Sequence, residues 1–251
     1  MAIDLSVNLN KIALIRNSRE GNYPDVTAFG RLSLDAGAAG LTVHPRPDQR
    51  HITPDDVRNL AALRTEYPRT EFNIEGNPFA PARGTYPGLI ELVAETNPEQ
   101  CTLVPDNDAQ KTSDHGFDLK TDGERLIPLI EKLHSLGARV SLFMDPDPEQ
   151  IALAKQIGAD RIELYTGPYA WAFGRNKEEG EQQFLLHKAA AEAALLCGLG
   201  INAGHDLNLQ NLPLYSQLPG LQEVSIGHAL TVDALLMGYS KAVAAYRAIC
   251  D

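Results

Sequence analysis

The chain has 251 residues, of which 43% are hydrophobic, and this length suits one (β/α)8 barrel domain spanning residues 1–251. The formal net charge of −11 argues against nucleic acid and anionic membranes as partners of the surface as a whole. Three cysteines without paired spacing, and the lack of a signal peptide or a long apolar run, favour a cytoplasmic protein with reduced thiols.

Strand-like and helix-like segments alternate along the chain. Strands are expected at residues 5–9, 40–43, 71–74, 101–104, 139–143, 161–164, 200–202 and 223–226. Helices are expected at residues 26–36, 53–67, 89–95, 123–136, 148–157, 178–197 and 229–249, with Thr53 as an N-cap. Eight strands separated by helices predict a (β/α)8 TIM barrel. A doubly wound open sheet is the alternative, although the first strand is not followed by a GxGxxG turn.

Two segments between the expected elements are unusually long. They are residues 76–88, after the third strand, and residues 105–121, after the fourth. In a barrel both would lie on the catalytic face, where long loops commonly contact substrate or cover it. Surface decoration is the alternative interpretation.

The segment AGLTVHPRPDQRHI, residues 39–52, places a basic cluster directly after a buried strand. His44, Arg46, Arg50 and His51 lie within eight residues of each other. Histidine can transfer protons near neutral pH, and arginine binds phosphate or carboxylate through a planar fork. Because barrel active sites lie at the C-terminal ends of strands, the cluster indicates a site for an anionic substrate.

Polar side chains follow most of the other expected strands. On strand alternation, Glu75 should share the inward face with Asn73, where an enclosed carboxylate suits acid–base chemistry. Glu163 has a similar position but could pair with Arg161 or Lys155. The remaining candidates at these strand ends are Asn8, Asn10, Lys11, Asp145, Asn202, His205, Asp206, Gly227 and His228.

Two Gly-His turns, at residues 204–205 and 227–228, come just after the seventh and eighth strands. Gly227 lets backbone N–H groups approach a ligand, and the helix expected from residue 229 would point its N-terminus at the same place. Phosphate sites recur at this position in barrels. Arg19 could bind a second phosphate or could be a solvated loop arginine.

At these residues the chain resembles the pyridoxine 5′-phosphate synthase family. The resemblance covers nearly the whole length. It rests on VNLNKIALIRNSR (7–19), GLTVHPRPDQRHI (40–52), FNIEGN (72–77), TLVPD (102–106), VSLFMD (140–145), IELYTGPYA (162–170), NAGHDLN (202–208) and SIGHAL (225–230).

The resemblance implies a barrel that condenses 1-deoxy-D-xylulose 5-phosphate with 3-amino-2-oxopropyl phosphate, without a cofactor, in a homo-octamer. His44 would be a general base, Glu75 a second acid–base group and His205 the proton donor. The other implied roles concern binding. Arg46, His51 and Thr112 would hold the sugar phosphate, and Asn8, Arg19, Gly227 and His228 the amino ketone phosphate. Arg50 is then expected to be structural.

Three positions depart from the common form of this family. Asn10-Lys11 stand where an Asp-His pair is common, and Asp206 stands where glycine is common. We expect Lys11 to support a substrate phosphate or hydroxyl, with a Schiff-base lysine as the alternative. Asp206 must point away from a phosphate or pair with a cation, because like charges repel. The loop after Glu75 is also longer.

Two other classes of protein remain as alternatives. One is a metal-dependent barrel hydrolase using His44, Glu75, His205 and His228, although no metal is expected because the first strand has no His-x-His pair. The other is a non-catalytic barrel that binds phosphorylated ligands, which residues Asn10, Lys11 and Asp206 would explain.

Overall fold

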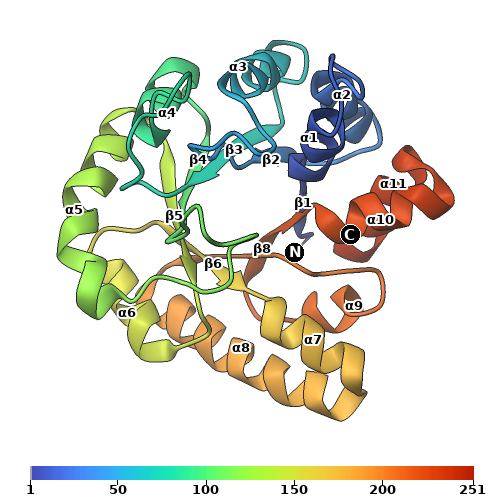
Figure 1. Ribbon diagram of the computed structural model, residues 1–251. Coiled ribbons are helices and arrows are strands. Elements are labelled where there is room, and N and C mark those ends of the chain that lie inside the picture. Colours follow the sequence, from blue (N-terminus) through green and yellow to red (C-terminus); the bar gives the residue numbers. More distant parts are fainter. Residues whose placement is uncertain (1) are drawn as a thin grey trace.

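Eight parallel strands close into a barrel in the computed structural model, which describes residues 2–251 (Figure 1). β1 pairs with both β2 and β8, so the sheet has no free edge. The open doubly wound sheet is therefore wrong, and the TIM barrel is confirmed. The strands are β1 (Asp4–Asn8), β2 (Gly40–Val43), β3 (Glu71–Gly76), β4 (Gln100–Leu103), β5 (Arg139–Met144), β6 (Arg161–Tyr165), β7 (Gly200–Gly204) and β8 (Leu221–Ile226).

Helices form a ring around the barrel (Figure 1). They are α1 (Asn10–Asn17), α2 (Val26–Asp35), α3 (Pro54–Ala62), α4 (Leu89–Thr96), α5 (Leu119–Ser135), α6 (Pro148–Gln156), α7 (Gly167–Arg175), α8 (Lys177–Cys197), α9 (Leu212–Tyr215), α10 (His228–Met237) and α11 (Tyr239–Cys250). α1 and α7 were not expected from the sequence. α5 begins earlier than expected, because the Asp118 side chain accepts a hydrogen bond from the Lys120 N–H and caps the helix there.

The expected single helix at residues 229–249 is wrong, because the chain forms α10 and α11 instead. Gly238 separates them with φ 87° and ψ 147°, a conformation that breaks the helical hydrogen-bond ladder. Glycine adopts this conformation readily because it has no Cβ. The glycine therefore turns α11 to a new direction against β1 and α2.

Thr53 caps α3, as the sequence predicts. Its side chain accepts a hydrogen bond from the Asp56 N–H while the Asp56 carboxylate accepts one from the Thr53 N–H, which forms a capping box. The same carboxylate forms a buried ion pair with Arg16 of α1. Arg16 also donates to the carbonyl of His51, so α1, the β2–α3 loop and α3 are fastened together beside the barrel mouth.

Polar side chains fill much of the barrel interior, where branched apolar residues are more usual. They are paired with each other: Ser6 with Thr42 at 2.7 Å, Thr102 with Asn73 at 3.2 Å, and Asn202 with Gln100 at 3.1 Å. The apolar core lies instead between the strands and the helices. Because these side chains are hydrogen-bonded to each other, they reduce the desolvation cost of a polar interior, although the Ser141 hydroxyl of β5 has no such partner.

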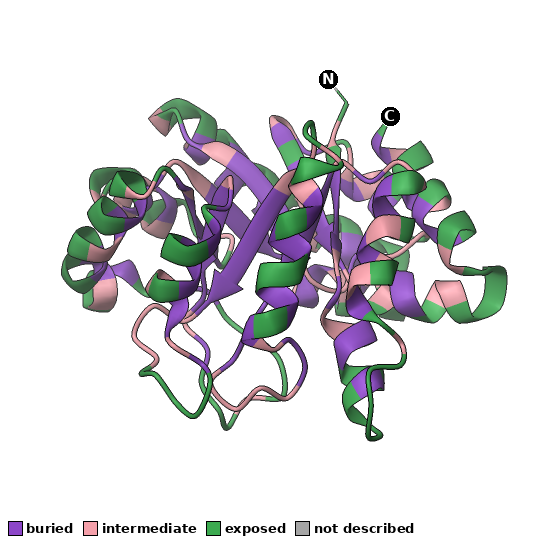
Figure 2. Cartoon of the chain, turned by 90° about the horizontal axis from the view of Figure 1, so that it is seen from above, coloured by how far each residue is buried: buried purple, intermediate pink, exposed green. Residues whose placement is uncertain are grey.

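All strands point toward one end of the barrel, where the long loops gather, and the C-terminus lies at the opposite end (Figure 2). The loops of residues 77–88, after β3, and 104–118, after β4, are both at this end. Their expected position on the catalytic face is confirmed.

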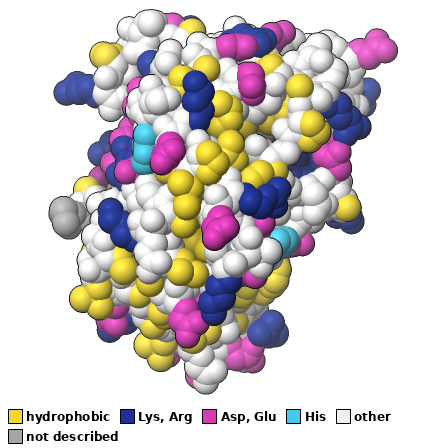
Figure 3. All heavy atoms as spheres, turned by 90° about the vertical axis from the view of Figure 1, so that its left-hand side faces the viewer, with side chains coloured by type: hydrophobic (Ala, Val, Ile, Leu, Met, Phe, Trp, Pro, Cys, Tyr) yellow, Lys and Arg dark blue, Asp and Glu magenta, His cyan; other side chains and the backbone are white. Residues whose placement is uncertain are grey.

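The outer face that carries α5 and α6 mixes both signs of charge (Figure 3). An ion pair of 2.9 Å between Lys120 and Glu149 joins these two helices. Among residues 2–251, no helix is both long enough and apolar enough to span a bilayer.

Candidate active site

A cavity of about 390 Å³ opens at the C-terminal ends of the strands. It brings together nearly all the candidate residues from the sequence. The exceptions are Arg19, which is exposed after α1, and Asp145 and Asn202, none of which lines the cavity. The predicted residues that line it are Asn8, Asn10, Lys11, His44, Arg46, His51, Glu75, Thr112, His205, Asp206, Gly227 and His228.

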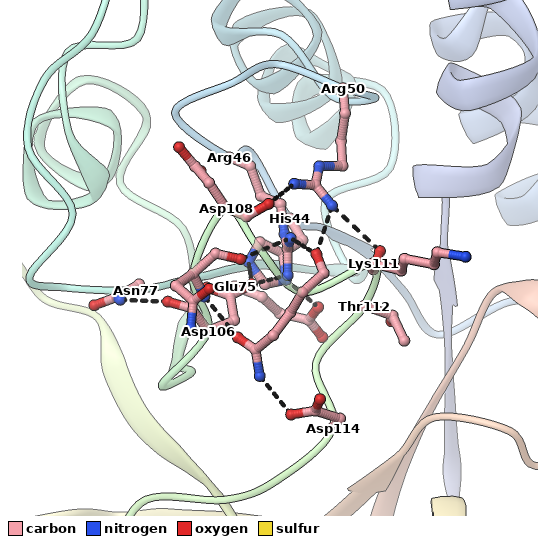
Figure 4. A network of polar contacts seen from close by, with 12 residues as sticks. His44, Arg46, Arg50, Glu75, Asn77, Asp106, Asp108, Lys111, Thr112 and Asp114 are labelled. Atoms are coloured by element: carbon pink, nitrogen blue, oxygen red, sulfur yellow. Dashed lines mark hydrogen bonds and ion pairs between the residues drawn. The ribbon is translucent and has the colours of Figure 1, made fainter.

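His44 lies at the end of β2 between two carboxylates (Figure 4). Its Nδ1 atom is 3.6 Å from Glu75 Oε2, and its Nε2 atom is 3.1 Å from Asp106 Oδ2. Burial alone would lower the pKa of His44, but its contacts with Asp106 and Glu75 outweigh burial and raise the pKa to about 9. These contacts therefore favour the protonated, positively charged imidazole at neutral pH.

Asp106 was missed from the sequence, although Pro105-Asp106 comes directly after the fourth strand. Its side chain is buried and forms an ion pair with Arg46 (Figure 4). Burial raises the pKa of Asp106, but the charges and contacts of His44 and Arg46 lower it by more. The net shift of the pKa is therefore downward. The carboxylate is therefore ionised and contacts two cationic groups.

Two arginines fasten the β2–α3 loop to the loop after β4. Arg46 donates to the carbonyl of Gln110 at 2.9 Å. Arg50 donates to the same carbonyl at 2.6 Å and to that of Asp108 at 2.8 Å (Figure 4). These contacts agree with a structural role for Arg50, although its side chain also lines the cavity.

His51 is neutral in this environment. Burial is the main cause that lowers its pKa to about 3, and the positive charges of His44 and Arg46 add to it. Its Nδ1 atom accepts a hydrogen bond of 2.9 Å from the Ile52 N–H. The proton of the neutral ring is therefore on Nε2, which is available as a donor.

His205 lies on the opposite side of the mouth, directly after β7. Its Nε2 atom is 2.8 Å from Thr112 Oγ1, and its Nδ1 atom is 3.0 Å from Asp206 Oδ2. His205 and Asp206 have φ values of 81° and 25°, which are unusual for residues other than glycine. Strained backbone of this kind is often found at functional sites.

Gly227 ends β8 and precedes α10, whose first residues line the cavity. A Cβ atom at this position would lie 2.9 Å from the Asn8 carbonyl oxygen, so β8 can approach β1 this closely only with glycine here. The N-terminus of α10 points unpaired N–H groups toward the cavity, which suits an anion.

Glu163 also lines the cavity and is almost fully buried. Burial first, and then the charges of Glu75 and Glu223, raise its pKa well above the ordinary value. Arg161, one of its two expected partners, pairs with Glu223 instead, at 3.2 Å. Glu163 therefore holds its proton more tightly than an ordinary glutamate does.

Residues 2–251 contain no group of three or more His, Cys, Asp or Glu side chains arranged to hold a metal ion. The four residues considered for a barrel hydrolase, His44, Glu75, His205 and His228, therefore do not form such a group.

Comparison with known proteins now identifies the family. Residues 5–251 match the family described as pyridoxal phosphate biosynthesis protein PdxJ. The chain belongs to this family. A pyridoxine 5′-phosphate synthase from Xanthomonas axonopodis pv. citri (strain 306) is 56% identical over 247 residues, which cover 98% of this chain and 96% of that protein. One from Albidiferax ferrireducens is 53% identical with the same coverage.

Solved structures show the same fold at low sequence identity. The 3-hexulose-6-phosphate synthase from Salmonella typhimurium has a TM-score of 0.62 and 17% identity, covering 99% of this chain and 100% of that one. A protein from Aquifex aeolicus VF5 has a TM-score of 0.64 and 15% identity, covering 99% of this chain and 93% of that one. These similarities concern the barrel alone.

The residues that depart from the common form of the PdxJ family have defined contacts. Asn10 Oδ1 accepts a hydrogen bond of 2.9 Å from the His44 N–H, so this position uses only an acceptor oxygen, which either Asn or Asp supplies. Lys11 lies near Asp206, whose charge opposes the lowering of the Lys11 pKa by burial. Asp206 therefore faces cationic groups, as expected for a carboxylate beside an anion site.

Proposed function

We propose that this barrel mouth condenses 1-deoxy-D-xylulose 5-phosphate with 3-amino-2-oxopropyl phosphate to form pyridoxine 5′-phosphate, phosphate and water. The observation that carries the proposal is one cavity whose lining combines His44, Glu75 and His205 with the cationic or anion-compatible groups of Lys11, Arg46 and the start of α10. Ring closure needs repeated proton transfer on a substrate held at its phosphates. Membership of the PdxJ family, and relatives named for this activity, support the same function.

The acid–base roles fall to His44, Glu75 and His205. His44 and Glu75 lie within 3.6 Å of each other, so a proton can pass between them with little movement. We assign His44 as general base, Glu75 as a second acid–base group, and His205 as proton donor from the opposite wall. Thr112 would then orient the His205 ring.

Two anion-binding regions lie on either side of these groups. Arg46, the neutral Nε2–H of His51 and the Thr112 hydroxyl would hold the sugar phosphate. Asn8, Gly227 and His228 would hold the amino ketone and its phosphate at the start of α10. Lys11 would add a positive charge between these regions. We assign no phosphate to Arg19, because its side chain does not line the cavity.

The test is an assay of the purified protein with both phosphorylated substrates. Pyridoxine 5′-phosphate and one equivalent of inorganic phosphate should form, and growth of a vitamin B6 auxotroph should be restored. His205→Ala should abolish turnover without unfolding the protein, whereas the exposed His134→Ala should not change it. Tight binding of both substrates without any product would contradict the proposal and favour a phospholigand-binding barrel.

We further propose that the chain works as a homo-oligomer in the cytoplasm. Leu235 and Leu236 of α10 are 78% and 85% exposed, next to the half-exposed Val232, which suits an apolar contact with another copy. The three free cysteines suit a reducing compartment. Light scattering should give an assembly, up to the octamer that the resemblance implies, and the double substitution Leu235→Glu, Leu236→Glu should reduce its mass. A wild-type monomer would contradict the proposal.

A further inference from the structure

Both ring nitrogens of His44 face carboxylate oxygens. Nε2 is 3.1 Å from Asp106 Oδ2, and Nδ1 is 3.6 Å from Glu75 Oε2. Ionised carboxylates only accept hydrogen bonds, and neutral imidazole has a single N–H group. Nε2 makes no hydrogen bond of ordinary geometry, so these contacts act through charge: two carboxyl groups at ion-pair distance favour the imidazole that carries a proton on each nitrogen.

Asp106 is held rigidly in this position. Its carbonyl oxygen accepts a hydrogen bond of 2.6 Å from Asn77 Nδ2, and its side chain pairs with Arg46 (Figure 4). Arg46 is itself fixed by the Gln110 carbonyl. Asp106, Arg46 and His44 are each no more than 5% exposed, so solvent does little to weaken these contacts.

None of the other groups described around His44 opposes its positive charge strongly enough to remove it. Glu75 comes from β3 and Asp106 from the loop after β4, while Arg46 and His51 come from the loop after β2. The His51 ring, 6.3 Å away between centroids, is neutral. Two carboxyl groups therefore lie beside His44, and one of them, that of Asp106, also pairs with Arg46.

We propose that Asp106 is a positioning residue that holds His44 as an imidazolium in the resting protein, so that His44 gives up a proton before it can accept one. The first half concerns the resting protein alone. The second half rests on the proposed function, because it orders the steps of His44 in that reaction. His44 becomes the general base only after a proton has moved from it to substrate or solvent.

This arrangement also links the base to substrate binding. Asp106 pairs with Arg46, the residue proposed to hold the sugar phosphate, while it contacts His44. A substrate phosphate that binds the Arg46 guanidinium therefore competes for Arg46 with the Asp106 carboxylate, which also stabilises the proton on His44. Asp106 contacts the side chains of His44 and Arg46, and its effect on the reaction acts through these two residues. The same loop also carries Thr112, which contacts His205.

The direct test is an NMR titration of histidine labelled with ¹³C in the substrate-free protein, with His44→Gln to assign its signal. The wild-type midpoint for His44 should lie above the ordinary 6.5. Asp106→Asn keeps the shape but removes the charge, and should lower the midpoint by at least one pH unit. Asp106→Glu should restore it in part. Asp108→Asn is the matched control in the same loop, because its carboxylate pairs with Arg83 outside the cavity, and should leave the midpoint unchanged.

A wild-type midpoint at or below 6.5, or an unchanged midpoint in Asp106→Asn, would overturn the proposal. The wild-type result does not depend on whether the variant folds. The pH dependence of kcat/KM should shift in the same direction as the titration in Asp106→Asn. If the protein made no product at all, the proposed function would fail, while the titration would still decide the role of Asp106.

Discussion

The Thr112 hydroxyl lies 2.8 Å from Nε2 of His205, although the two residues are 93 positions apart in the chain. Thr112 belongs to the loop after β4 and His205 follows β7. Their hydrogen bond therefore crosses the mouth of the barrel and sets the orientation of a ring proposed to donate a proton.

Thr112→Val should keep the shape of the side chain and remove this hydrogen bond. A single hydrogen bond contributes about 0.5–1.5 kcal/mol, so we expect roughly a two- to tenfold loss of kcat/KM. Steady-state kinetics with both substrates measure it. Thr85→Val, which removes a hydrogen bond to Gln49 on an exposed loop, is the control and should have no effect. Equal activity of the two variants would exclude a role for the Thr112 hydroxyl.

Asp56→Ala should destabilise the protein strongly. The Asp56 side chain is 8% exposed, caps α3 and pairs with the equally buried Arg16. Removing one partner of a buried ion pair costs about 3 kcal/mol or more, because the other charge is left unpaired. The neighbouring Asp55 is 86% exposed, and Asp55→Ala should change stability by less than ~0.5 kcal/mol. Urea unfolding of both variants compares them; similar losses would show that the buried pair is not important for stability.

His187 should make the fold sensitive to acid. Burial lowers its pKa to about 4, and its Nδ1 atom is hydrogen-bonded to the Tyr215 hydroxyl at 2.8 Å. The unfolded chain binds a proton below pH ~6.5 and the folded chain does not until about 4, so stability falls as the pH drops through this window. Between pH 7 and pH 5 the loss from this residue is about 2 kcal/mol.

His187→Gln should therefore reduce the loss of stability between pH 7 and pH 5, measured by urea unfolding at each pH. The adjacent exposed Lys188→Gln is the control and should keep the wild-type pH dependence. Some acid sensitivity should remain in both, because His51 also has a lowered pKa. An unchanged pH dependence in His187→Gln would mean that this histidine does not stay neutral in the folded chain.

Gly238→Ala should destabilise the junction of α10 and α11. Nothing lies within 4 Å of a Cβ at this position, but its φ of 87° is unfavourable for alanine and should cost about 2 kcal/mol. Gly174 in α7 has equally open space and helical backbone, so Gly174→Ala should instead stabilise by up to ~1 kcal/mol. Thermal unfolding should give shifts of opposite sign. Shifts of the same sign would show that backbone conformation does not decide the effect.

The strands and most helices could be predicted because each depends on local signals. The Thr53 side chain caps the start of α3, and Gly198 ends α8 through its left-handed backbone conformation. The family predicted from the motifs is confirmed. The break at Gly238 could not be predicted, because a single glycine within an apolar helical pattern does not show whether the chain turns there.

The candidate site was predicted less completely, for reasons of tertiary structure. The strand ends identified His44 and His205 because all C-terminal ends of parallel strands meet at one mouth. Asp106 was missed because its importance comes from contacts with residues 60 or more positions away. The sequence did not show that Arg19 is exposed either, because it lies beyond the end of α1 while Arg16, in the last turn of that helix, takes the buried position.

Arg46 and Arg50 hold the loop after β4 in place largely by hydrogen bonds to its main-chain carbonyl oxygens. A carbonyl oxygen is present whatever the amino acid, so several side chains in residues 107–111 are free to vary while the loop keeps its place. The sequence of this loop, which lies over the substrate cavity, can thus be changed while its hydrogen bonds to Arg46 and Arg50 remain. The loop is therefore a suitable starting point for engineering a barrel that accepts a different phosphorylated ketone.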